Sequence, residues 1–235
     1  MAAGTDWAGD VTGEELIPTP EDEAAIRAGQ RALVRSGYDV ISHAYRSDDG
    51  AAHSSTDEDP GLYVEWVAEL AGLIPARARV VDLGCGIGLP GTRALTEHGL
   101  SVLGVDFSAV QLARARRLVP AASFVRADMA EFHLRPASVD AVTAFYSLIH
   151  LPLADQRALL PRIRGWLRPG GYLLALVGAA YWTGTEPYLG ADMFRDHADT
   201  GAYLRWCREA RLTPQWHRFI PEGNSGHTLI LATAS

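Results

Sequence analysis

The chain has 235 residues, a length that suits one α/β domain with an N-terminal extension rather than two full domains. Its formal net charge is −7 and its cations form no basic stripe, so we expect no nucleic-acid partner. The sequence contains no lysine, which excludes a lysine Schiff base or a lysine general base. It shows neither a signal-peptide pattern nor an apolar run that could cross a bilayer, so we expect a cytoplasmic protein that does not bind membranes.

The N-terminal part predicts a loose extension followed by a helix. Residues 1–18 lack hydrophobic periodicity and are expected to be disordered or loosely packed. Thr19 is a good N-cap and Pro20 suits the first helical position, so a helix is predicted to begin here. We expect this helix to end at Gly37, because glycine commonly follows the last helical turn.

A helical cap is expected to continue up to the main domain. A second short helix is predicted over 38–46, followed by a polar loop that reaches Asp59. An amphipathic helix is then predicted to begin near Pro60. Residues 19–76 together are predicted to form this N-terminal cap.

Residues 77–235 predict a Rossmann-like, doubly wound α/β sheet. Runs such as 102–105 and 172–177 are apolar at every position, as strands of a parallel sheet buried on both faces require. Short apolar runs alternate with helical patterns, which is typical of this architecture. The expected strands lie near 79–84, 101–105, 122–126, 138–145 and 171–178, and the expected helices lie near 89–98, 108–118 and 154–167.

The C-terminal part predicts an antiparallel edge to this sheet. A helix near 199–210 precedes a strand near 214–220. A turn over 221–226 then leads into a strand over 227–233. We therefore expect a seven-stranded sheet that is closed by a C-terminal antiparallel hairpin.

Three glycines, Gly84, Gly86 and Gly88, lie between the first predicted strand and the helix that follows it. A turn without side chains lets a ligand lie against the backbone at the carboxyl end of that strand. Residues 86–91 also satisfy the dinucleotide pattern G-x-G-x-x-G. The glycines alone therefore fit a dinucleotide as well as a sulfonium nucleoside.

Acidic residues near the ends of three successive strands favour the second of these ligands. Asp82 is placed to attract the ammonium group of a bound amino acid, which is less compatible with a pyrophosphate. Asp106 is placed to accept both ribose hydroxyls, and Phe107 beside it is placed to lie on an adenine ring. Asp128 is placed to accept a hydrogen bond from the adenine amino group.

The segments 82–88, 106–108, 127–129 and 167–172 together resemble the class I S-adenosylmethionine-dependent methyltransferases, and especially their small-molecule branch in specialised metabolism. The resemblance extends from about Tyr38 to the C-terminus. It implies S-adenosylmethionine as the cofactor and a lid tyrosine near the sulfonium. The cofactor-binding residues that we expect from this reasoning are Tyr45, Asp82, Gly84, Gly86, Asp106, Phe107, Gln111, Asp128, Met129 and Phe145.

The methyl acceptor is expected at the same edge of the sheet, where ligands of open α/β sheets bind. The insertion over 179–198 is rich in aromatic residues and is too polar and irregular for a sheet element, so it predicts a substrate wall. Tyr146 and Trp182 are expected to line that pocket. His150 and Glu186 are the main candidates for a general base.

More remote candidates for the base are His43, His197 and His227. No metal is expected, because the sequence lacks the D-x-x-D-N arrangement of metal-dependent catechol methyltransferases. Cys85 and Cys207 lie too far apart to suggest either a metal site or a disulfide framework.

These features predict methyl transfer to an O, N or C atom of a small aromatic or heterocyclic metabolite, mainly by proximity and alignment. One alternative is an NAD(P)-dependent oxidoreductase, which predicts a parallel sixth strand. Another is an enzyme that binds S-adenosylmethionine for different chemistry. The expected partner is a small-molecule methyl acceptor. A homodimer is one candidate for the oligomeric state.

Overall fold

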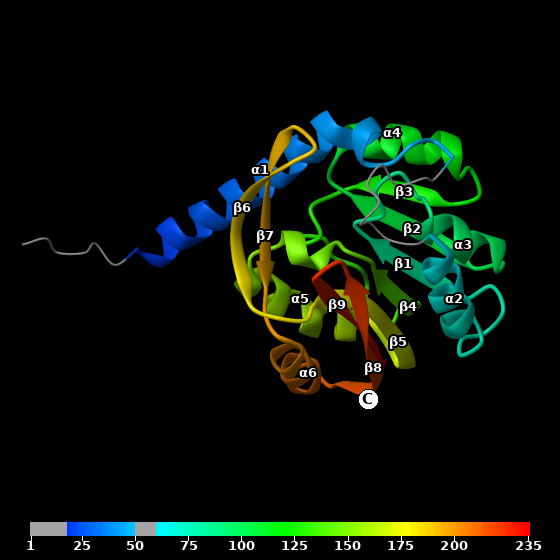
Figure 1. Ribbon diagram of the computed structural model, residues 1–235. Helices are drawn as coiled ribbons and strands as arrows, with labels where there is room; N and C mark the ends of the chain where they lie inside the picture. Colours follow the sequence, from blue (N-terminus) through cyan, green and yellow to red (C-terminus); the bar gives the residue numbers. More distant parts are fainter. Residues whose placement is uncertain (1–17, 50–59) are drawn as a thin grey trace, which may run out of the picture.

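The computed structural model describes residues 18–49 and 60–235 (Figure 1). The extension predicted over 1–18 therefore lies almost entirely outside the described residues, and so does the polar loop up to Asp59. Within the described ranges, no helix is long and apolar enough to span a membrane. The helices are α1 (Pro20–Tyr45), α2 (Pro60–Ala71), α3 (Gly91–Glu97), α4 (Ala109–Leu118), α5 (Leu153–Trp166) and α6 (Thr200–Glu209), with a short 3₁₀ helix over Leu148–His150. The strands are β1 (Arg79–Leu83), β2 (Ser101–Asp106), β3 (Ser123–Arg126), β4 (Val139–Ala144), β5 (Leu167–Gly178), β6 (Trp182–Tyr188), β7 (Ala191–His197), β8 (Leu212–Glu222) and β9 (Ser225–Ala234).

The main sheet has seven strands in the order β3-β2-β1-β4-β5-β9-β8. Strands β1 to β5 run parallel, whereas β9 pairs antiparallel with both β5 and β8. Gly223 and Asn224 connect β8 to β9. The predicted Rossmann-like sheet with its C-terminal antiparallel hairpin is thus confirmed. Because the parallel strands end at one edge, the residues that follow β1, β2, β3 and β4 meet there.

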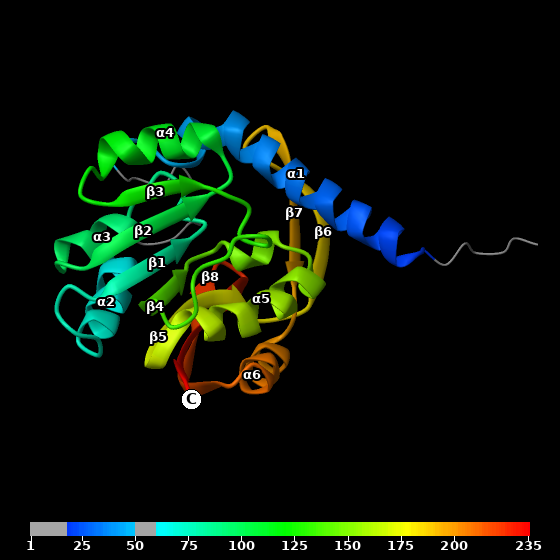
Figure 2. The ribbon, with the colours of Figure 1, turned by 180° about the vertical axis from the view of Figure 1, so that it is seen from behind.

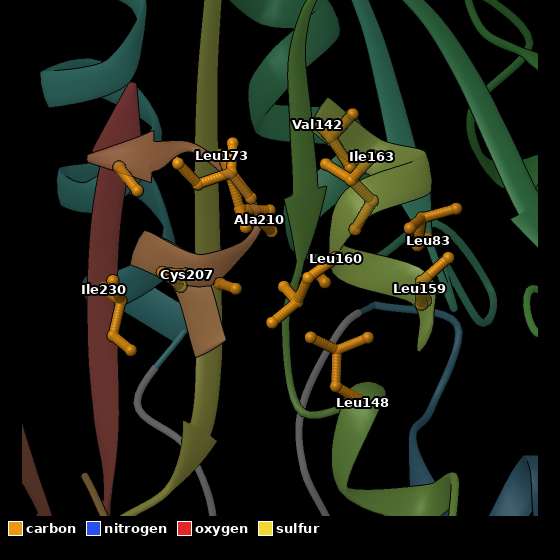
Figure 3. Packing of buried hydrophobic residues seen from close by; sticks show 14 of the residues in the cluster. Leu83, Val142, Leu148, Leu159, Leu160, Ile163, Leu173, Cys207, Ala210 and Ile230 are labelled. Carbon is orange, nitrogen blue, oxygen red and sulfur yellow. The ribbon is translucent and has the colours of Figure 1, made fainter. Parts of the chain in front are cut away.

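Helices cover both faces of the sheet, and Figure 2 shows the opposite side of the molecule. On one face, α5 and α6 pack through side chains such as Ile163 and Cys207 against Val142 and Leu173 of the strands (Figure 3). On the other face, α2 and α3 share a second buried cluster with the sheet. Burial on both faces explains why the strand sequences are almost continuously apolar.

Helix α1 is continuous, so the predicted break at Gly37 is wrong. Its start is confirmed, because Thr19 caps it through a reciprocal hydrogen-bonded capping box. Gly37 is buried in the middle of the helix against strand β7. A Cβ atom at this position would lie 2.9 Å from Met193 Cε and 3.2 Å from the Asp192 carbonyl oxygen. The glycine therefore permits a close approach between α1 and β7 and does not end the helix.

The insertion over 179–198 forms a two-stranded sheet of its own, so the prediction of an irregular segment is wrong. Strands β6 and β7 pair antiparallel over their whole length. Leu189 and Gly190 form the turn with φ angles of 51° and 92°, and a two-residue turn with both residues in this region matches the twist of a hairpin. A leucine rarely adopts positive φ, so this turn lacks the usual sequence signal of a hairpin.

Helix α1 lies across the β6–β7 hairpin in both views of the molecule (Figures 1 and 2). Val34 and Ile41 of the helix share a buried cluster with Met193 and Phe194 of β7. Segments that are far apart in the sequence thus pack together beside the carboxyl edge of the main sheet.

Two glycines of α1 give a matched test of this packing. Gly29 is exposed and a Cβ there would meet no atom within 4 Å, so Gly29→Ala should stabilise the fold by about 0.5–1 kcal/mol through helix propensity. Gly37→Ala should not give this stabilisation, because the added methyl group would lie too close to Met193 and Asp192. Thermal unfolding of both variants measures the difference, and equal stabilisation by both would contradict the close approach.

Candidate active site

The glycine turn after β1 is pressed against the segment that follows β4. Gly84 and Gly86 have φ angles of 70° and 54°, a backbone region that favours glycine. A Cβ atom on Gly84 would lie only 2.2 Å from the Cβ of Ser147. Ser147 Oγ donates a 2.7 Å hydrogen bond to the carbonyl oxygen of Leu83, which fixes this contact. The turn can therefore contain no side chain at Gly84, and its backbone lines the adjacent cavity.

Asp106, the last residue of β2, is held next to this turn. Its Oδ2 accepts a hydrogen bond from the Gly86 backbone N–H at 2.9 Å, and its Oδ1 accepts one from the Ser108 backbone N–H at 2.8 Å. Burial raises the pKa of Asp106 to about 6, although both N–H groups act in the opposite direction. When ionised, this carboxylate is a rigidly oriented acceptor at the edge of the cavity.

Asp82 lies on β1 just before the turn. Its two oxygens accept hydrogen bonds from Thr92 Oγ1 at 2.6 Å and Thr143 Oγ1 at 2.8 Å. Burial raises its pKa to about 6, and the threonine hydroxyls partly oppose this shift. Asp82 also lines a recess that shares Gly84 and Gly86 with the cavity at the carboxyl edge.

We call this cavity at the carboxyl edge the cofactor cavity. Every residue predicted to bind the cofactor lines either this cavity or the recess beside it. The recess is lined by Asp82 and shares several lining residues with the cavity. The other predicted residues that line the cavity are Tyr45, Gly84, Gly86, Asp106, Phe107, Gln111, Asp128, Met129 and Phe145. They come from α1 and from the segments that follow β1, β2, β3 and β4.

A second cavity of about 500 Å³, called the acceptor cavity below, lies between the hairpin β6–β7 and the C-terminal hairpin. It contains both residues predicted as substrate walls, Tyr146 and Trp182. Its size and its aromatic walls suit a small planar ligand. The residues shared with the cofactor cavity are Tyr38, Tyr45, Tyr146 and His150. The two cavities therefore meet at these four side chains.

His150 lies at this junction with both ring nitrogens engaged. Nδ1 is 3.0 Å from the carbonyl oxygen of Phe194, which only accepts, so Nδ1 carries the proton. Nε2 consequently accepts a hydrogen bond from the Tyr38 hydroxyl at 2.9 Å. Burial lowers the pKa of His150 to about 3, although its bond to Phe194 opposes the shift. The residue is thus neutral and orients the Tyr38 hydroxyl.

The other base candidates take different places. Glu186 lines the acceptor cavity, but half of its side chain is exposed, and it lies 3.7 Å from Arg195 across the hairpin. His197 lines the same cavity, and burial lowers its pKa to about 4. His43 is exposed on α1 and lines neither cavity.

A pair on the C-terminal hairpin, Glu222 and His227, is more deeply placed in the acceptor cavity. His227 Nδ1 lies 3.1 Å from Glu222 Oε2, and the Tyr146 hydroxyl donates to Glu222 Oε1. Burial alone would raise the pKa of Glu222, but His227 and Tyr146 outweigh it and lower the pKa. Glu222 is not among the residues expected from the sequence, and His227 is only a remote candidate there. The available signal was an acid inside the predicted turn over 221–226 and a histidine directly after it.

Tyr146 reaches this pair from a strained backbone. Its φ is 52°, which is unusual for a residue with a large side chain. Such conformations persist where the surrounding structure enforces them, and they cluster at functional sites. The tyrosine ring packs edge-on against the His227 ring with centroids 5.1 Å apart. The strain thus accompanies a side chain that lines both cavities.

A family model described as a methyltransferase domain matches residues 80–171. This segment contains the glycine turn and the strand ends that carry the aspartates. The chain carries a class I methyltransferase domain. The cofactor of this family is S-adenosylmethionine.

Individual relatives agree with this methyltransferase assignment. The chain is 29% identical over 194 residues to the ubiquinone biosynthesis O-methyltransferase of Pseudomonas aeruginosa, an alignment that covers 74% of this chain and 80% of the relative. It is 38% identical over 141 residues to the 27-O-demethylrifamycin SV methyltransferase of Amycolatopsis mediterranei, covering 57% of this chain and 49% of that relative. The solved 1,6-didemethyltoxoflavin-N1-methyltransferase of Burkholderia thailandensis shares the fold with a TM-score of 0.64 at 21% identity, covering 92% of this chain and 91% of that structure.

The buried, neutral state of His150 predicts a pH-dependent stability. Its pKa falls from 6.5 to about 3 on folding, so between these values the unfolded chain binds the additional proton and the fold loses stability as the pH falls. In His150→Gln this loss should be smaller by up to about 1.4 kcal/mol per pH unit. Urea unfolding across this range measures the slope. His133→Gln, at an exposed loop position, is the control and should keep the wild-type slope, whereas an unchanged slope in His150→Gln would contradict the assignment.

Proposed function

We propose that this methyltransferase domain transfers the methyl group of S-adenosylmethionine to an O, N or C atom of a small aromatic or heterocyclic molecule. The observation that carries the proposal is the meeting of the cofactor and acceptor cavities at Tyr38, Tyr45, Tyr146 and His150. Methyl transfer needs the acceptor atom, the methyl carbon and the sulfur in line, which two adjoining cavities allow. The names of the ubiquinone and rifamycin relatives support a small-molecule acceptor.

The residues of the cofactor cavity fit the parts of this cofactor. The oriented carboxylate of Asp106 suits the two ribose hydroxyls, and Phe107 suits the face of the adenine. The carboxylate of Asp128 suits the adenine amino group. The bare backbone at Gly84 leaves room for the methionine part beside Asp82. When bound, the cofactor supplies an electrophilic methyl group on a sulfonium.

An acceptor that reacts through N–H or O–H must also lose a proton. Glu222 and His227 support this step, because a carboxylate next to an imidazole stabilises the protonated ring. Glu186 is less suited to this role because it is half exposed, and His150 is less suited because both of its ring nitrogens are hydrogen-bonded. The catalytic roles expected from the sequence for these two residues stay predictions. Among the described residues, no three His, Cys, Asp or Glu side chains are grouped as metal ligands.

Two alternative functions, an oxidoreductase and an enzyme that uses S-adenosylmethionine for different chemistry, make different predictions. The oxidoreductase alternative predicts a parallel sixth strand, whereas β9 runs antiparallel to β5. An enzyme that uses S-adenosylmethionine for different chemistry would have a similar cofactor site, so the mass of the product separates the two. A homodimer and a cytoplasmic location stay predictions from the sequence.

Cofactor binding is tested first. S-Adenosylhomocysteine should raise the melting temperature of the wild type and NADH should not. Asp106→Ala should weaken S-adenosylhomocysteine binding by at least about tenfold in calorimetry, since hydrogen bonds to a charged group are lost. Asp192→Ala, an exposed aspartate on β7, is the control and should bind normally. Stabilisation by NADH alone, or normal binding by Asp106→Ala, would overturn the assignment.

Turnover is tested by screening phenols and N-heterocycles with methyl-labelled cofactor, and the product should gain one methyl group as S-adenosylhomocysteine is released. With an acceptor of the N–H or O–H type, Glu222→Gln and His227→Asn should lower kcat by roughly 10²–10⁴-fold and leave cofactor affinity intact. His150→Ala should also slow turnover without loss of binding. His217→Asn, exposed on β8, is the matched control. Full activity of both Glu222→Gln and His227→Asn would exclude the pair as the proton acceptor.

A further inference from the structure

Arg31 of helix α1 contacts three carboxylates below the helix. Its Nε donates to Asp128 Oδ2 at 2.8 Å, and its Nη2 lies 3.1 Å from Glu131 Oε1. Its Nη1 donates to Asp155 at the start of α5. The Arg31 side chain is only 11% exposed. Each of the three guanidinium nitrogens therefore has a carboxylate partner, and the group is held in one orientation.

Asp128 is fixed by this contact from one side and by the backbone from the other. Its Oδ1 accepts a hydrogen bond from the Ala130 N–H at 2.9 Å, while Arg31 holds Oδ2. The residue lines the cofactor cavity, whereas Arg31 lies outside that cavity in a neighbouring hollow that Asp128 also lines. Arg31 thus acts on the cavity through Asp128.

The charge and orientation of Asp128 matter for the purine that it faces. An ionised carboxylate only accepts hydrogen bonds, so it pairs with the 6-amino group of adenine. The 6-oxo group of hypoxanthine is itself an acceptor and meets the carboxylate oxygen without a hydrogen. The guanidinium of Arg31 within hydrogen-bond distance keeps the carboxylate in one orientation. Asp128 is partly buried, with 27% of its side chain exposed, and a site with a fixed acceptor discriminates against a ligand that leaves this acceptor unpaired.

We propose that Arg31 is the positioning residue through which Asp128 selects a 6-amino purine, so that the choice of cofactor depends on helix α1. The inference rests on the proposed function, which places the adenine at Asp128. Arg31 is 97 positions away from Asp128, and it belongs to the helix that also lines the acceptor side of the molecule through Tyr38 and Tyr45. The ion pair between Arg31 and Asp128 therefore links adenine recognition to the docking of α1.

The test compares S-adenosylhomocysteine with S-inosylhomocysteine by calorimetry on the full chain. The wild type should prefer the adenosyl compound by roughly 10- to 100-fold, as expected for one hydrogen bond to a charged group. In Arg31→Met that ratio should fall below about threefold, and in Arg31→Lys, which keeps a charge near Asp128, it should partly recover. Asp128→Asn should lose the preference as well, because an amide can also donate to the 6-oxo group.

Arg27→Met is the matched control. Arg27 lies one turn earlier on α1, and its Nε is 3.2 Å from Asp155 Oδ1, so its loss weakens the docking of the helix without removing the contact to Asp128. Arg27→Met should keep the wild-type ratio. Equal weakening of both ligands by Arg31→Met, with an unchanged ratio, would overturn the inference and leave Arg31 a docking residue. A wild type that binds neither compound would instead refute the proposed function and the inference with it.

Discussion

The close approach of the glycine turn to Ser147 determines the geometry of both cavities. Only a residue without a side chain fits at Gly84, and the hydrogen bond from Ser147 to Leu83 holds the segments after β1 and β4 together. The turn exposes its backbone to the cofactor cavity. The neighbouring Tyr146 has a positive φ of 52° and lines the acceptor cavity as well. The backbone held by this contact therefore lines the cofactor cavity, and the adjacent Tyr146 lines both cavities.

Helix α1 completes the cofactor cavity from the opposite side. Asp39 accepts a hydrogen bond from Ser108 Oγ at the N-terminus of α4, and Ser42 donates one of 2.8 Å to Gln111 on the same helix. Together with Arg31, these contacts attach α1 to the segments that follow β2 and β3. The helix is joined to the same elements that carry the cavity residues. The packing of α1 against these elements therefore also closes the cofactor cavity.

The sequence predicts the features that depend on consecutive residues. The glycine turn and the aspartates follow the ends of parallel strands, and the sheet topology alone brings strand ends to one edge, so their meeting could be foreseen. Contacts between distant segments could not, since nothing near Arg31 in the sequence indicates that it reaches Asp128. Gly37 illustrates the same limit, because a buried helical glycine looks like a helix end until its neighbour Met193 is known.

The hairpin β6–β7 combines residues that anchor it to α1 with residues that line the acceptor cavity. Met193 and Phe194 of β7 are buried against α1, whereas β6 is mostly exposed and contributes Trp182, Glu186 and Tyr188 to the acceptor cavity. Substitutions of Trp182 and Glu186, which lie outside the buried clusters, therefore change the side chains that face the acceptor with little effect on the folding of the domain. This strand is the part of the molecule in which a lineage of such enzymes could acquire new substrates by small evolutionary steps, while the cofactor machinery stays constant.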